Sequence, residues 1–90
     1  MQKEDVMWLI LVKLNRMSKF GGAHTALRNI TKGLPSFITS NKKGKKLIEK
    51  AIKELIRSNF LIAKPSTSEI HISLDPRKIK EIREFIQKYK

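Results

Sequence analysis

Residues 6–12 read VMWLILV, an apolar stretch whose side chains the rest of the fold must bury. Apolar residues recur at helical spacing from Val6 to Met17, which predicts a helix capped by Asp5 and running to about Met17. The positions between them are also mostly apolar, so this helix is apolar nearly all round. A helix of that kind must be covered on two sides. We expect a small domain core on one side, and a second helix or a partner subunit on the other.

The length of this stretch and the residues before it limit the classes of protein to which the chain can belong. A membrane-spanning helix needs about 20 apolar residues, and the acidic residues Glu4 and Asp5 before a short run argue against a signal peptide. The chain has 90 residues and no cysteine, which excludes a disulfide framework or a thiolate metal site. The sequence therefore predicts one cytoplasmic domain over residues 1–90, with a core at about 5–74 and a C-terminal helix at about 76–90.

Two further helices are predicted in the middle of the chain. Gly21–Gly22 should end the first helix, and Thr25 reads as the cap of a short second helix that Gly33 ends. Ser40 or Asn41 can cap a third helix, ending near Asn59. Three apolar residues should anchor the connection between these helices: Leu34, Phe37 and Ile38. The third helix is expected to bury Leu47 or Ile48, Ala51, Ile52, Leu55 and Ile56.

Two short strands and a last helix complete the predicted order. The branched residues of FLIAKPS (60–66) and EIHISL (69–74) favour strands, with a turn at Ser66–Ser68. Asp75 caps and Pro76 opens the last helix. Its apolar stripe consists of Ile79, Ile82, Ile86 and Tyr89, with Phe85 beside it. The fold class is α+β, mainly helical.

The order of these elements resembles a winged helix-turn-helix domain. The resemblance covers roughly Asp5 to Leu74, and AIKELIRSNFLIAKPSTSEIHISL carries it best, as the end of a recognition helix followed by two wing strands. It implies a three-helix core, a two-stranded wing and an extra C-terminal helix. It also implies that the amino-terminal part of the third helix enters the major groove of DNA.

The charge is concentrated where this resemblance places the DNA. The formal net charge is +12, and residues 13–64 hold 13 basic residues against Glu49 and Glu54, a net of +11. Such an excess points to a polyanion, nucleic acid first and an anionic membrane surface second. Glu49 can pair with Lys53 at i,i+4 spacing. Lysines crowd the amino end of the third helix, where the helix dipole disfavours cations but backbone N–H groups bind phosphate.

The predicted nucleic-acid contacts lie on the second helix, the third helix and the wing. They are Arg28, Ser40, Asn41, Lys42, Lys43, Lys45, Lys46, Lys50, Lys53, Arg57, Lys64, Ser66, Thr67 and Ser68. For Ser40 and Asn41, helix capping is an equal alternative. Trp8, Phe20 and Phe37 are expected in the core or an interface rather than stacked on bases.

The sequence predicts no enzyme, no cofactor and no metal site. It contains no phosphate-binding glycine loop and no Ser-His-Asp set, and its two histidines, His24 and His71, fall on different elements. We therefore predict a transcriptional regulator that binds duplex DNA as a homodimer through its first and last helices. The alternatives are a structural RNA-binding protein of the ribosomal type, a module that binds an acidic protein, and a lysine face that is merely solvated.

Overall fold

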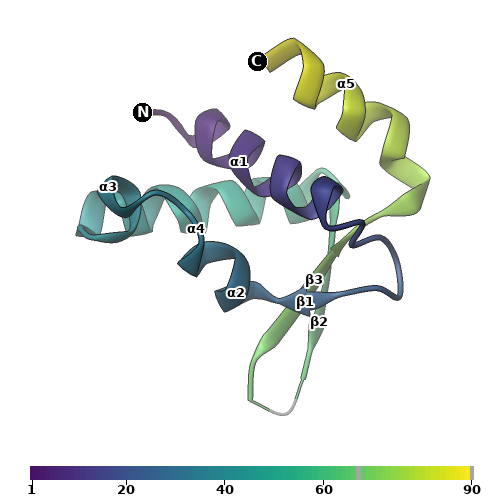
Figure 1. Cartoon of the computed structure of the whole chain (residues 1–90), viewed down its shortest axis with the longest axis horizontal. Helices are drawn as coiled ribbons and strands as arrows, with labels where there is room; N and C mark the ends of the chain where they lie inside the picture. Colours follow the sequence, from purple (N-terminus) through teal and green to yellow (C-terminus); the bar gives the residue numbers. More distant parts are fainter. Residues whose placement is uncertain (67, 90) are drawn as a thin grey trace.

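The computed structural model describes residues 1–66 and 68–89. Its elements are α1 (Lys3–Arg16), β1 (Thr25–Ala26), α2 (Leu27–Lys32), α3 (Ser36–Thr39), α4 (Lys42–Arg57), β2 (Leu61–Pro65), β3 (Ile70–Leu74), the 3₁₀ helix η1 (Pro76–Lys78) and α5 (Ile79–Tyr89) (Figure 1). The molecule is α+β and mainly helical, with one three-stranded antiparallel sheet. In the part of the chain described, no helix is long and apolar enough to cross a membrane.

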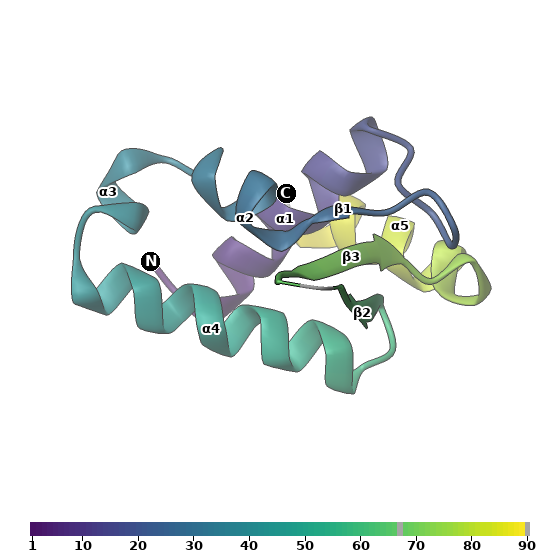
Figure 2. The ribbon, with the colours of Figure 1, turned by 90° about the horizontal axis from the view of Figure 1, so that it is seen from below.

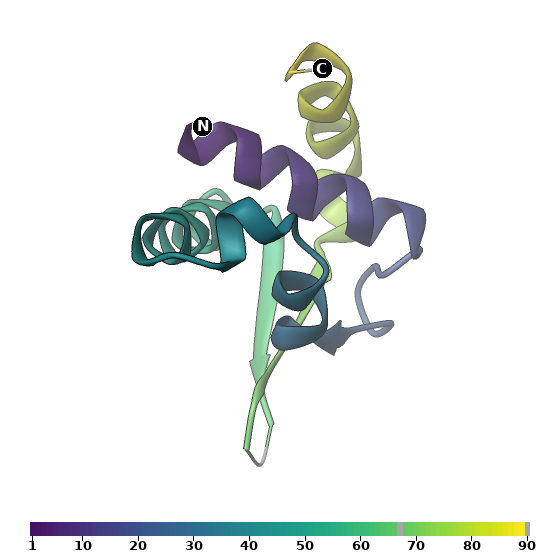
Figure 3. The same cartoon turned by 60° about the vertical axis from the view of Figure 1, so that its left-hand side comes forward.

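Helix α1 lies at the centre and is covered on two sides, as its composition demands. The views in Figures 1 and 3 place α2 and α4 on one side of it and α5 on the other. The side chains of Val6, Ile10 and Leu14 are fully buried, as is Ile82 of α5. The indole N–H of Trp8 donates to the carbonyl oxygen of Ile86 at 2.8 Å. The second cover therefore comes from the same chain.

The ends of α1 differ from the sequence prediction. Asp5 lies inside the first turn, where its carboxylate accepts the Gln2 backbone N–H at 2.6 Å, so it is not the cap residue itself. Ser18, with φ of 55°, ends the helix before the glycines are reached. The Lys19 N–H then donates to the Leu14 carbonyl at 3.0 Å, the bond expected when a helix closes through a left-handed residue.

Strand β1 was not predicted. Thr25 is not a helix cap, because it pairs with Ile72 of β3. The N-cap position of α2 is occupied by Ala26. The strand order is β1-β3-β2, so β3 is central. The two predicted strands are confirmed as β2 and β3, with Leu61 opposite Leu74.

The β2–β3 hairpin projects beyond the helices, which explains its burial pattern (Figures 1 and 3). Ile72 and Leu74 are fully buried next to the helices, whereas Ile70, nearer the tip, is 48 % exposed. The hairpin is therefore buried at its base, where Ser73 between Ile72 and Leu74 is also only 1 % exposed, and is exposed towards its tip.

The C-terminal helix begins as predicted. The Asp75 carboxylate accepts the Arg77 backbone N–H at 2.9 Å, and Pro76 opens η1, which continues into α5. Hydrogen bonds from the Arg77 side chain and backbone hold the pKa of Asp75 below its ordinary value. Of the predicted stripe, Ile82 is fully buried, while Tyr89 is partly exposed and its hydroxyl donates to Asp5 at 3.0 Å.

Candidate nucleic-acid interface

The amino end of α4 is fixed by Asn41. Its side-chain oxygen accepts the Gly44 backbone N–H at 2.7 Å, and its amide nitrogen donates to the carbonyl oxygen of Phe37 at 3.0 Å. Of the two predicted caps, the structure selects Asn41, while Ser40 ends α3. One side chain therefore joins α3 to α4 and sets where the lysine-rich helix begins.

Gly44 lies among the lysines because α3 passes very close to α4. A Cβ atom at this position would overlap with the carbonyl group of Ile38, a backbone group that cannot rotate away. Gly44 is itself buried on the inner side of the helix. A residue that looks like a defect in the helix is therefore what allows the two helices to pack.

Asn41→Ala tests the capping role separately from any contact with a ligand. Loss of the two hydrogen bonds should lower the free energy of unfolding by about 1 kcal/mol. Ser40→Ala is the matched control and should change it by less than about 0.5 kcal/mol, as surface substitutions usually do. Urea unfolding followed by circular dichroism measures both. Equal stability of the two variants would contradict the assignment of Asn41 as the cap.

The exposed side of α4 carries a continuous group of lysines, here called the lysine face. It lies opposite the inward residues Ile48, Ala51 and Leu55, given about 100° of rotation per residue. Its members are Lys42, Lys43, Lys45, Lys46, Lys50 and Lys53, all exposed. Among the residues described, none of them forms a salt bridge. The predicted Glu49–Lys53 pair is therefore not formed. Figure 2 shows α4 along the outer edge of the molecule, with no other element beyond it.

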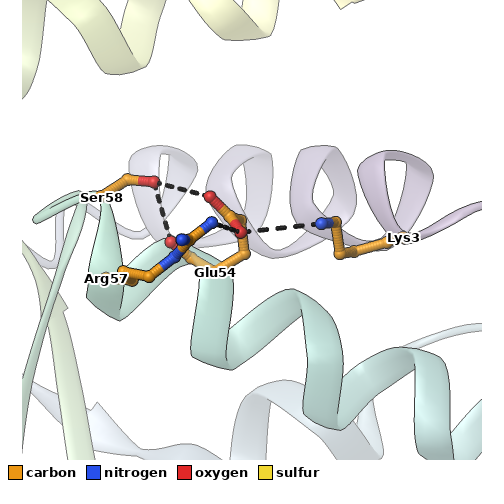
Figure 4. Close-up of polar contacts among 4 residues, drawn as sticks. All are labelled: Lys3, Glu54, Arg57 and Ser58. Atoms are coloured by element: carbon orange, nitrogen blue, oxygen red, sulfur yellow. Dashed lines mark hydrogen bonds and ion pairs between the residues drawn. The ribbon is translucent and has the colours of Figure 1, made fainter.

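The positive charge of Arg57, also predicted as a contact, is paired with a carboxylate. Its guanidinium donates to Glu54, which also accepts the Ser58 hydroxyl at 3.2 Å and lies 3.6 Å from the Lys3 ammonium (Figure 4). The hydrogen bond from Arg57 is the main cause that keeps the pKa of Glu54 below its ordinary value. The group ties the end of α4 to α1, so Arg57 is less available for a phosphate than the lysine face.

The positive charge of Arg28 is also paired with a carboxylate. Its guanidinium lies 3.0 Å from the carboxylate of Glu69, which precedes β3 in the turn of the hairpin. This pair spans a groove of about 580 Å³ between α2, α4 and β3, whose apolar lining includes Leu27, Ile52 and Ile70. The structure therefore gives Arg28 a partner within the chain, in the turn at the tip of the hairpin.

The remaining predicted contacts belong to the β2–β3 hairpin. Lys64 is exposed on β2, opposite His71. The Ser66 backbone N–H donates to the Glu69 carbonyl at 2.8 Å and closes the turn, and Ser68 is exposed. Thr67, also predicted as a contact, lies outside the described residues.

The two histidines meet, which their positions in the sequence did not predict. Their Nδ1 atoms lie 2.8 Å apart, so one ring donates to the other, and Glu69 is 3.6 Å from His71 Nε2. Within the described ranges, no group of three or more His, Cys, Asp or Glu side chains could hold a metal ion. The histidine pair joins the loop before β1 to β3.

Phe37 is a candidate residue that the sequence analysis placed wrongly. It was expected to pack in the core and anchor the connection between the predicted second and third helices, where the structure has α3, but its side chain is 63 % exposed beside the lysine face. Leu34 and Ile38 are buried instead. Because α3 has only four residues and begins at Ser36, after Leu34, helical spacing gave no signal that separates Phe37 from these neighbours.

Comparison of the chain with protein-family models, curated proteins and solved structures gave no significant match. The function is therefore argued from the geometry of α4 and its surroundings.

Proposed function

We propose that this chain is a winged-helix protein that binds double-stranded DNA through the lysine face and the β2–β3 hairpin, as a transcriptional regulator. The lysine face carries the proposal. In the free protein its lysines repel one another at i,i+4 spacing, and those of the first turn oppose the helix dipole. Bound phosphates neutralise the repulsion and release counterions, so the arrangement becomes favourable on a polyanion.

The shape of α4 supports duplex DNA as the polyanion. The helix has 16 residues, or about 24 Å at 1.5 Å per residue. The major groove of B-DNA is about 12 Å wide and admits an α-helix, whereas the major groove of A-form RNA is too deep and narrow for side chains to read. The hairpin, with Lys64 near its tip, can reach the backbone beside that groove.

The order of the elements supports the winged-helix assignment. Helix, strand, helix, helix, strand and strand follow one another from α1 to β3, if α3 is taken as an added turn before α4. In that arrangement α4 is the third helix and the β2–β3 hairpin is the wing, as the sequence resemblance implies.

Competition binding tests the choice of nucleic acid. A labelled duplex DNA bound to the protein is displaced with unlabelled duplex DNA or with a structured RNA, at equal phosphate concentration and fixed salt. The proposal predicts that duplex DNA competes at the lower concentration. More effective competition by RNA would favour the structural RNA-binding alternative, and failure to bind either would contradict both.

Selection of bound duplexes from a random pool then tests the regulatory role, which requires an enriched sequence.

The proposal does not depend on a homodimer. The sequence argument for one was the need for a second cover over α1, and α5 of the same chain provides it. Light scattering at micromolar concentration distinguishes a particle of 10.4 kDa from one of twice that mass. A dimer would imply paired half-sites in the DNA, and a monomer a single site.

A further inference from the structure

An apolar pocket of about 450 Å³ lies beside the amino end of α4, on the flank next to α3. Met1, Phe37 and Leu47 contribute its apolar lining, and Lys43, Lys46 and Lys50 also line it. The pocket thus combines an exposed aromatic ring with three members of the lysine face. The Phe37 ring belongs neither to the surface of α4 proposed to enter the DNA groove nor to the hydrophobic core.

Phe37 is held in its exposed position by the fold. The Asn41 amide donates to its backbone carbonyl, and Gly44 lets α3 lie against α4. Leu34 and Ile38, on either side of it in the chain, are buried, so the α3 backbone cannot turn the ring inward without exposing them. A ligand that covers this ring removes apolar surface from water without first reorganising the protein.

The chemistry of the pocket restricts what that ligand can be. It must offer an apolar face to Phe37 and negative charge to Lys43, Lys46 and Lys50. A second copy of this chain, placed here by a two-fold axis, would bring its own three lysines against these three. Paired bases in a duplex are stacked and cannot reach a ring beside the groove. An unpaired nucleotide has both a free base and a phosphate, and bases stack on aromatic side chains.

We propose that this pocket binds an unpaired nucleotide next to the duplex held by α4, with its base stacked on Phe37 and its phosphates on Lys43, Lys46 and Lys50. The inference rests on the proposed function, because α4 must bring the nucleic acid to the pocket. It adds a preference: the protein should bind a duplex with a single-stranded overhang more tightly than the duplex alone.

The test compares two overhangs of equal charge. One duplex carries a short single-stranded overhang with bases, and the other carries the same overhang built from abasic nucleotides. Fluorescence anisotropy should show about tenfold tighter binding of the overhang with bases by the unaltered protein, which is within the range for one stacked base. Phe37→Ala should bind both overhangs alike, at the affinity of the abasic one, and Phe37→Trp should retain the preference.

A fluorescent base in the overhang gives a second readout. 2-Aminopurine at the first unpaired position should lose fluorescence when the unaltered protein binds, and should not do so with Phe37→Ala, although the phosphates are unchanged. Because Phe37 is mostly exposed, circular dichroism should show the same fold for both variants.

The possible failures are distinguishable. Equal binding of the two overhangs by the unaltered protein, with the blunt duplex still bound, would overturn the pocket assignment and leave the proposed function standing. A preference that persists in Phe37→Ala would also overturn it. If neither overhang nor the blunt duplex binds, the proposed function fails and the inference fails with it.

Discussion

Gly44→Ala should lower the free energy of unfolding by about 2 to 3 kcal/mol, the upper part of the range for overpacking a tight contact. In an exposed helix the same change would raise stability by about 1 kcal/mol, because alanine is the better helix former. Here the added methyl group overlaps with the Ile38 carbonyl, so α3 must move away from α4. That movement would also strain the Asn41 hydrogen bonds at the amino end of α4. Chemical denaturation measures the change directly.

Gly22→Ala is the matched control for this substitution. A Cβ atom at Gly22 meets nothing within 4 Å, and the backbone there is not in the left-handed region. The change should be neutral or stabilising by up to about 1 kcal/mol, since alanine restricts the unfolded chain. A Gly44→Ala variant as stable as Gly22→Ala would show that α3 does not pack on α4 as described.

The double variant Lys46→Ala and Lys50→Ala should bind duplex DNA roughly 50-fold more weakly at 0.1 M salt. Each phosphate contact contributes about 0.9 to the slope of log affinity against log salt, so two lost contacts should reduce the slope by about two. The loss should be similar for every DNA sequence, because phosphates carry no sequence information. Stability should hold or rise by a few tenths of a kcal/mol, since the two lysines repel at i,i+4 spacing. A titration of affinity over several salt concentrations measures the effect.

Lys78→Ala and Lys80→Ala together change the net charge by the same amount on a different element. Lys78 lies 3.6 Å from Glu81, and residues 65–90 hold four acidic residues beside six basic ones, so positive charge is less concentrated there than on α4. This pair should leave the affinity within about threefold of the unaltered protein, because it removes no phosphate contact. Equal losses from the two pairs would mean that the charge acts diffusely, and the structural RNA-binding alternative would gain support.

Local patterns predicted the long elements well. Helical spacing located α1, α4 and α5, and branched residues located β2 and β3. The sequence also predicted Asp75 as a cap residue and Asn41 as one of two possible caps for α4. The predicted end of the third helix near Asn59 is confirmed: α4 ends at Arg57, and Asn59 follows in the left-handed region with φ of 64°. These features depend on neighbouring residues, which is why the sequence alone was sufficient.

Other features depend on contacts between distant segments, and the sequence did not show them. β1 has two residues and exists because Thr25 and Ala26 pair with β3, far along the chain. The reason for Gly44 is the position of Ile38 on another helix. The ion pair of Arg28 with Glu69 and the hydrogen bond between His24 and His71 likewise join residues more than 40 positions apart. In the candidate site, sequence spacing found the lysine face but not the pairing that sets Arg28 and Arg57 apart from it.

The claim that α4 is the DNA-binding element can be tested residue by residue with NMR. Backbone amide shifts of the ¹⁵N-labelled protein are followed while a short duplex DNA is added at moderate salt. The account predicts that the largest changes fall in residues 41–57, with smaller ones at Lys64 and Ser66 in the hairpin, while residues 79–89 of α5 stay unchanged. Changes concentrated in α5, or spread evenly over the whole chain, would contradict it.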